Sequence, residues 1–183
     1  MANVNGTQVK TNPVRLSYAH VFEPYSFNGG EPKYSVTLLI PKDDIETLLC
    51  IEKAQRQAYE NAKGDKLKNL KFEQIKTTLH DGEEYDTEEL PEYADMMFIS
   101  VSCKTKPGII DQHRQPITDS SQVYSGCWCR ADINFFAYNT AGNKGISAGL
   151  NNLQKIRNDA PLGGRSRAED VFDDWEDSEE DIF

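Results

Sequence analysis

The sequence predicts a mainly β protein, with one small, strongly curved sheet and a single helix inserted after the second strand. Three observations support this prediction. Apolar and polar residues alternate in several short stretches, one longer stretch has the period of a helix, and turns or long loops separate them. Because the strands do not alternate regularly with helices, a parallel sheet is disfavoured. The 183 residues suffice for one domain with its own core, followed by a tail.

The first two predicted strands are residues 14–22 and 33–40. Apolar members of the first are Leu16, Tyr18, Val21 and Phe22. In the second, one face carries Tyr34, Val36, Leu38 and Ile40. The loop between the strands is rich in Pro and Gly and contains two aromatic residues, Tyr25 and Phe27.

A helix is predicted between Asp43 and Gly64. Asp43 can cap its first turn, with Glu46 three residues later as in a capping box, and Gly64 is a favoured stop. A mostly apolar stripe with a period near 3.6 is formed by Ile45, Leu48, Leu49, Glu52, Ala54 and Ala58. Residues 65–95 have no clear assignment and are expected to be partly loop.

Two further strands are predicted at residues 97–105 and 127–138, and residues 146–158 form a final strand or a short helix. A long, turn-rich arm precedes the second of these, and the Gly/Asn turn NTAGNKG follows it. Five strands and one helix fit a five-stranded barrel of the OB type. We expect this domain to span residues 1–164 and a flexible acidic tail to span residues 165–183.

The strand at 127–138 is the most informative stretch. One face suits a barrel interior and carries Cys127, Cys129, Ala131, Ile133, Phe135 and Ala137. The other carries Trp128, Arg130, Asp132, Asn134, Phe136 and Tyr138. Nucleic-acid bases stack on exposed aromatic rings, and an arginine nearby can neutralise phosphate or stack as a cation. Two alternatives stay open: the aromatic residues pack under the helix, or they form a dimer interface.

Other residues can extend this surface. On the neighbouring strand, the outer face includes Phe98 and leads to two lysines. The candidate nucleic-acid contacts are Trp128, Arg130, Phe136 and Tyr138, with Phe27, Lys33, Lys104, Lys106, Arg114 and Lys144. Binding by such residues combines stacking with neutralisation of phosphates.

The net charge of −10 is unevenly distributed. Nine acidic residues lie in 169–183 and eight more in 81–95, a stretch that we call the acidic segment. The rest of the chain holds 13 acidic and 20 basic residues, a net charge of +7. Most of the protein is therefore basic, and this distribution allows a nucleic-acid ligand despite the low overall isoelectric point.

Motifs for metal binding and catalysis are weak, and we expect no catalytic residue, no metal site and no cofactor. Cys127 and Cys129 lack a second ligand pair at zinc spacing and suit a buried position. GISAG at 145–149 resembles a nucleophile elbow, but no histidine follows it. The sequence lacks a phosphate-binding GxxxxGK[ST] loop. A metal-dependent nuclease using the acidic segment stays open as a rival, although a solvated surface is the commoner explanation.

The tail combines acid with aromatic and aliphatic residues. A tail that only aids solubility does not need Trp175, Ile182 or a terminal Phe183. Its acids can imitate phosphates and occupy the basic groove of the protein itself. The carboxylate and ring of Phe183 also form a good handle for a basic pocket on a partner.

Four stretches carry a resemblance to a known family: SYAHVFEP, KYSVTLLIPKDD, KPGIIDQHRQPI and VYSGCWCRADINFFAYNTAGNKGISAGLNNLQKIRNDAPLGG. Together they resemble the phage single-stranded-DNA-binding proteins with an OB fold, a group once filed as a phage domain of unknown function. The match covers residues 14–164, and the tail is similar to those of phage and bacterial single-strand binders that end in acids and Phe.

The resemblance implies a protein that is not an enzyme. It would bind single-stranded DNA largely without sequence preference during phage replication, recombination or repair. The tail would recruit replication or recombination proteins and compete for the DNA groove, and such proteins are often homodimers. The alternative is a structural or adaptor protein whose aromatic face binds another protein. Lacking a signal peptide or a membrane segment, the chain is expected to act in the cytoplasm, that of the bacterial host if it is phage-encoded.

Overall fold

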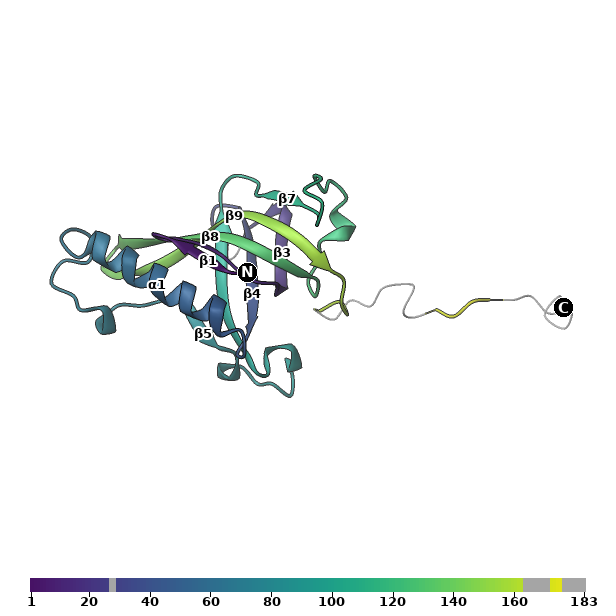
Figure 1. The fold of residues 1–183 in the computed structure, drawn as a ribbon, viewed down its shortest axis with the longest axis horizontal. Helices are drawn as coiled ribbons and strands as arrows, with labels where there is room; N and C mark the ends of the chain where they lie inside the picture. The colour runs from purple at the N-terminus through teal and green to yellow at the C-terminus, as the bar shows by residue number, and fades with distance from the viewer. Residues whose placement is uncertain (27–28, 163–171, 176–183) are drawn as a thin grey trace, which may run out of the picture.

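The computed structural model describes residues 1–26, 29–162 and 172–175. Its centre is a closed ring of five strands in the order β3–β4–β6–β9–β8, with β8 returning to β3 (Figure 1). These strands are β3 (Val14–Tyr25), β4 (Lys33–Pro41), β6 (Met96–Cys103), β8 (Trp128–Thr140) and β9 (Asn143–Arg157). This ring confirms the predicted OB-type barrel. The predicted boundary at 164/165 lies outside the described residues, as does most of the tail that we expected to be flexible.

The barrel closes where β6 meets β9 in parallel, at the single pair Ser102–Gly149. Beyond this pair, a segment before β6 fills the gap between the two strands. The Lys76 carbonyl accepts a hydrogen bond of 2.8 Å from the Ile146 amide, and β5 (Leu79–Asp81) pairs with β6. Part of the unassigned region 65–95 therefore seals the barrel wall.

Three more short strands extend the sheet. β1 (Asn3–Asn5) and β2 (Gln8–Lys10) form a hairpin that pairs with β8, and β7 (Gly108–Ile110) pairs with β9. Each has only three residues, too few to show an alternating pattern, so the sequence did not reveal them. The described residues also contain four 3₁₀ turns: η1 (Phe72–Gln74), η2 (Gly82–Glu84), η3 (Pro91–Tyr93) and η4 (Ser120–Gln122).

The helix α1 (Ile45–Ala62) follows β4, as predicted, and lies against one end of the barrel (Figure 1). Its cap is Asp44, whose side chain accepts a 3.2 Å hydrogen bond from the Thr47 amide, and not the predicted Asp43. The predicted apolar stripe is partly wrong: Ala54 and Ala58 are buried, but Ile45 and Leu49 are 57% and 56% exposed. The buried face of the helix consists of Thr47, Ile51, Ala54, Gln55, Ala58 and Ala62. Small residues on this face let the helix backbone approach the strands.

The barrel core follows the predicted alternation. In β8 and the residue before it, the six residues assigned to the interior are at most 9% exposed. On β4 the interior residues are Val36, Leu38 and Ile40. β9 is a strand throughout, so this stretch, for which a final strand or a short helix was expected, is a strand.

The acidic segment is ordered, and it packs on the outer face of β4 and β6. Leu39, Tyr93 and Phe98 form a small second core there, and the Tyr85 ring lies 5.2 Å from that of Phe98. Phe98 is therefore on the outer face, as predicted, but only 7% exposed. The role expected for it in an open aromatic surface was wrong, because the acidic segment covers it.

Lys42 ties the acidic segment to the end of β4. Its ammonium group pairs with Asp81 at 2.8 Å and also with Glu83. These hydrogen bonds hold the pKa of Asp81 down, at about 2, mainly through Lys42, and raise the pKa of Lys42. Gly82 is required beside them, because a Cβ there would lie 2.2 Å from the Tyr93 carbonyl oxygen. In the described part of the chain, no helix is long and apolar enough to cross a membrane.

Candidate nucleic-acid interface

The outer face of β4 and β6 carries a patch of hydroxyl groups. Strand register places Ser35 beside Ser102 and Thr37 beside Ser100, and the Thr37 and Ser100 hydroxyl oxygens are 3.3 Å apart. These four residues, which we call the hydroxyl floor, line a shallow hollow of about 180 Å³. Short, uncharged side chains let a flat ligand approach the strands closely.

Aromatic side chains border this floor on β3. Between Ser17 and His20 the pairing of β3 with β4 shifts, and the resulting bulge contains Tyr18. Tyr18 has a φ of +47° and is 57% exposed. Beyond the bulge, the rings of His20 and Tyr25 stack with centroids 4.4 Å apart. The border thus offers two aromatic platforms.

Three of the predicted cations lie together at one end of the floor, which we call the cationic end. Lys33 pairs with Tyr25 across the β3–β4 hairpin, and Lys104 follows Cys103, the partner of Tyr34. The ammonium group of Lys106 lies 5.2 Å from the centre of the Phe22 ring on β3. One competing charge is present, since Lys104 pairs with Glu31 at 3.5 Å.

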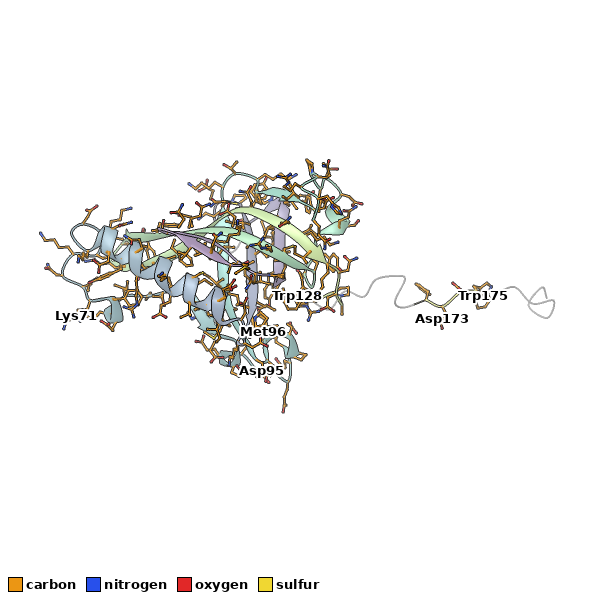
Figure 2. The ribbon with its side chains drawn as sticks, viewed as in Figure 1. Lys71, Asp95, Met96, Trp128, Asp173 and Trp175 are labelled. Carbon is orange, nitrogen blue, oxygen red and sulfur yellow. The ribbon has the colours of Figure 1, made fainter. Side chains whose placement is uncertain are left out.

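Trp128 and Arg130 use their polar groups internally. The Trp128 indole N–H donates a 2.9 Å hydrogen bond to Asp159, and the Arg157 guanidinium lies 4.4 Å from the centre of the Trp128 ring. Arg130 donates to the backbone carbonyls of Thr11 and Met1, at 2.9 and 2.8 Å. Figure 2 shows Trp128 at the edge of the barrel.

The hydrogen bond from Trp128 also lowers the pKa of the Asp159 carboxyl group. Arg15 supports the same stretch, because it pairs with Asp159 at 3.8 Å and donates to the Ala160 carbonyl at 2.8 Å. Trp128 therefore helps to fix the segment through which the chain leaves the barrel.

Phe136, Tyr138 and Lys144 form a separate group on the β8–β9 hairpin. Phe136 is 46% exposed and lines a hollow of about 280 Å³ together with the end of α1. Tyr138 pairs with Gly145 and is half-buried. The other predicted contacts are dispersed: Arg114 lies in an exposed turn of the arm between β7 and β8, and Phe27 lies outside the described residues.

Sequence reasoning did not single out Tyr18 and His20, which border the candidate interface. Strict alternation would place Tyr18 on the same face as Leu16, inside the barrel. A signal was nevertheless present in the sequence, because the apolar residues Leu16 and Val21 are five positions apart, and both prove to be buried. Such spacing requires an extra residue in the strand, which is the bulge that turns Tyr18 outward.

The two cysteines on β8 do not belong to this surface. The sulfur atoms of Cys127 and Cys129 are 3.8 Å apart and buried. Their mutual hydrogen bond lowers the pKa of Cys127 to about 7 and raises that of Cys129. Over the residues that the structure describes, no group of three His, Cys, Asp or Glu side chains is placed to hold a metal ion.

The tail residues fall partly outside the structure. Trp175 and Phe172 are described and are 80% and 75% exposed. Ile182 and Phe183 lie outside the described residues. The last described residues before the tail, Pro161 and Leu162, line a cleft beside Tyr18.

Comparisons with known proteins agree with this fold. A protein from Acyrthosiphon pisum secondary endosymbiont phage 1, described as putative protein p50, is 33% identical over 186 residues, which cover 95% of this chain and 97% of that protein. Phage T7 gp2.5, a single-stranded-DNA-binding protein, is 16% identical with a TM-score of 0.61 over 97% of this chain and 100% of its own, and it supports the fold alone.

The single-stranded-DNA-binding protein of bacteriophage Enc34 matches in both sequence and structure. Its complex with single-stranded DNA is 31% identical, with a TM-score of 0.72 over 86% of this chain and 90% of its own. A C-terminal truncation of that protein has a TM-score of 0.73 at 29% identity, covering 85% and 89%. The family model built on the Enterobacter phage Enc34 protein matches residues 7–183. The chain therefore belongs to the Enc34 single-stranded-DNA-binding protein family.

Proposed function

We propose that this protein binds single-stranded DNA, largely without sequence preference, during phage DNA replication, recombination or repair. The observation that carries the proposal is the relative solved with single-stranded DNA, which is 31% identical and matches 86% of this chain. The hydroxyl floor, its aromatic border and the cationic end supply the chemistry that such a ligand needs.

The strand would lie across the outer face of β4 and β6, where OB folds commonly bind oligonucleotides. Bases would stack on Tyr18 and on the paired rings of His20 and Tyr25. The cationic end would neutralise phosphates. None of these contacts reads a base edge, so this part of the surface accepts any sequence.

The remaining predicted contacts divide into two roles. Phe136, Tyr138 and Lys144 lie on the paired strands of the β8–β9 hairpin, and they would extend the path of the strand. The same role is proposed for Phe27, which lies outside the described residues. Arg114 would reach it only from the exposed arm. For Trp128 and Arg130, the internal hydrogen bonds favour support of the barrel edge over a stacking contact.

A panel of labelled oligonucleotides tests the proposal: single-stranded DNA, single-stranded RNA and duplex DNA, each titrated at several salt concentrations. We expect single-stranded DNA to bind more tightly than duplex, with an affinity that falls as salt rises. Equal affinity for single strand and duplex, without salt dependence, would refute it. If the protein were instead an adaptor, changing the aromatic border would weaken the binding of a protein partner and would leave DNA affinity unchanged.

We further propose that the acidic tail recruits replication or recombination proteins and competes with DNA for the basic groove. The described body ends at Leu162, which borders the same face as Tyr18. The following 21 residues, if extended, would span about 70 Å, enough to cross this face. Nine acidic residues at 169–183 would be attracted to the cationic end.

Deleting residues 169–183 tests the competition. We expect the shortened protein to bind oligo-dT more tightly, with the largest gain at low salt, where the tail is attracted most strongly. Removing Phe183 alone is the matched control, because it keeps all nine acidic side chains and should affect partner binding more than DNA binding. Unchanged affinity after the deletion would refute self-competition and leave the binding of single-stranded DNA intact.

A further inference from the structure

A cleft of about 650 Å³ lies between the bulge of β3 and the acidic segment. Its lining includes Tyr18 and His20 from β3, and Glu89 and Glu92 from the acidic segment. Leu90 and Leu162 supply apolar surface and also pack against the second core of Leu39, Tyr93 and Phe98. The cleft is therefore built on ordered structure, and it combines an aromatic ring with two carboxylates.

Tyr18 is held in position for a ligand. Its positive φ is uncommon for an aromatic residue and follows from the bulge, which the Ala19 amide fixes by donating a 3.0 Å hydrogen bond to the Ser125 hydroxyl. A strained residue of this kind persists only where the surrounding structure holds it, and such residues are frequent at binding sites. Tyr18 is 57% exposed and lines the cleft in this conformation.

The carboxylates of Glu89 and Glu92 can accept hydrogen bonds. Among the residues described, every ion pair involves other acidic groups, so Glu89 and Glu92 are not neutralised by a lysine or arginine. Two such carboxylates repel phosphate, and they also disfavour a carbonyl oxygen placed beside them. They accept hydrogen bonds from an amino group, as carboxylate side chains do from the N4 amino group of cytosine.

We propose that this cleft receives one base of the bound strand and favours a base with an exocyclic amino group, such as cytosine, over thymine or uracil. The base would stack on Tyr18 and donate its amino hydrogens to Glu89 and Glu92. Repulsion by these carboxylates would turn the phosphates toward the cationic end. The inference rests on the proposed function and adds one selective position to a surface that otherwise accepts any sequence.

An arginine or lysine of a protein partner would satisfy the same groups, since a cation also binds carboxylates and aromatic rings. The location favours a base. Tyr18 lines both this cleft and the hollow above the hydroxyl floor, so the two spaces adjoin at this residue. A DNA strand crossing the floor therefore reaches the cleft without leaving the surface.

Oligo-dC and oligo-dU of equal length test the inference at neutral pH, because the two bases differ only in the amino or carbonyl group at C4 and the protonation of N3. We expect the full-length protein to bind oligo-dC about fivefold more tightly. The double variant Glu89→Gln/Glu92→Gln should lose this ratio, because an amide can donate to a carbonyl as well as accept. The control Glu84→Gln/Glu88→Gln removes two charges of the same segment outside the cleft, and it should keep the ratio.

The outcomes separate this inference from the function on which it rests. Salt-dependent binding of both oligonucleotides with equal affinity would overturn the cleft inference and leave the proposed function standing. Failure to bind either one would refute the proposed function itself. Equal binding, together with capture of a short arginine peptide that requires Glu89 and Glu92, would assign the cleft to a protein partner. The inference would also be overturned if the control variant lost its preference for oligo-dC over oligo-dU to the same extent as the double variant, because the preference would then reflect net charge alone.

Discussion

Replacing Lys33, Lys104 and Lys106 with alanine would remove three positive charges from one end of the hydroxyl floor. All three side chains are exposed, so the substitutions should leave the barrel folded. They should weaken the binding of single-stranded DNA and reduce its dependence on salt. The reason is that each lysine in contact with a phosphate releases a counterion from the DNA.

The number of lysines at the cationic end sets the size of the change in salt dependence. For single strands, each phosphate contact contributes roughly 0.7 to the slope of log affinity against log salt concentration, so three contacts contribute about 2. Lys104 is partly compensated by Glu31, at 3.5 Å, and its share should be smaller than that of Lys33. The triple variant should therefore lose between about 1.4 and 2.1 from the slope, and up to roughly 100-fold in affinity at 0.1 M salt.

Fluorescence anisotropy of labelled oligo-dT, measured from 50 to 200 mM salt, gives both quantities. A matched control replaces Lys53, Lys63 and Lys71, three exposed lysines on α1 and in the loop that follows it. Figure 2 places Lys71 at the end of the molecule opposite Trp128. If the control lost as much slope as the triple variant, the effect would be one of net charge, and the cationic end would not be the phosphate site.

Two further predictions concern the fold. Ile51→Ala should lower the free energy of unfolding, measured in urea, by about 3 kcal/mol, because Ile51 is fully buried. Leu49→Ala should change it by less than about 0.5 kcal/mol, because Leu49 is 56% exposed. Similar losses in the two variants would contradict the observed helix face. The second prediction uses a Trp175→Phe variant, whose only tryptophan is Trp128. Its tryptophan fluorescence should change with pH at a midpoint below 3.8, the ordinary pKa of an aspartate, because the indole hydrogen bond favours the ionised form of Asp159. The stability from this contact is present above pH 3.8 and lost as pH falls through the lowered pKa, so a midpoint at or above 3.8 would exclude it.

Family membership confirms that the protein is of a DNA-binding class and not an enzyme class. The structure also shows what the acidic segment does in the fold. Asp81 and Glu83 are paired with Lys42, and Tyr85 and Tyr93 cover Phe98. The segment is therefore structural, as well as a negatively charged wall beside the floor.

The faces of strands that keep a regular alternation, such as β8, were predictable because one barrel wall separates core from solvent. In β8, alternation assigned Phe135 to the interior and Phe136 to the outside, and their exposures are 1% and 46%. The helix face was not predictable in the same way. α1 carries apolar side chains on more than one side, and only the shape of the barrel end selects the face with Ala54 and Ala58.

The binding surface depended on structure for a related reason. Local sequence identified Trp128 as an aromatic residue on an outer face. It did not show that Asp159 accepts a hydrogen bond from the indole N–H or that the Arg157 guanidinium lies over the ring, because both residues come about 30 positions later in the chain. Tyr18 is exposed only because a bulge breaks the strand pattern. Lys33 and Lys104, which are 71 residues apart, meet because β4 pairs with β6.

The sequence by itself determined the barrel, the place of the helix, the interior of β8 and the division of charge between a basic body and acidic appendages. These features follow from local periodicity and composition, which each stretch of chain carries independently. Only the tertiary structure decided which aromatic residues are free, which cations lie together, and where the acidic segment packs. Those properties depend on strand register and on contacts between distant residues, and no local pattern records them.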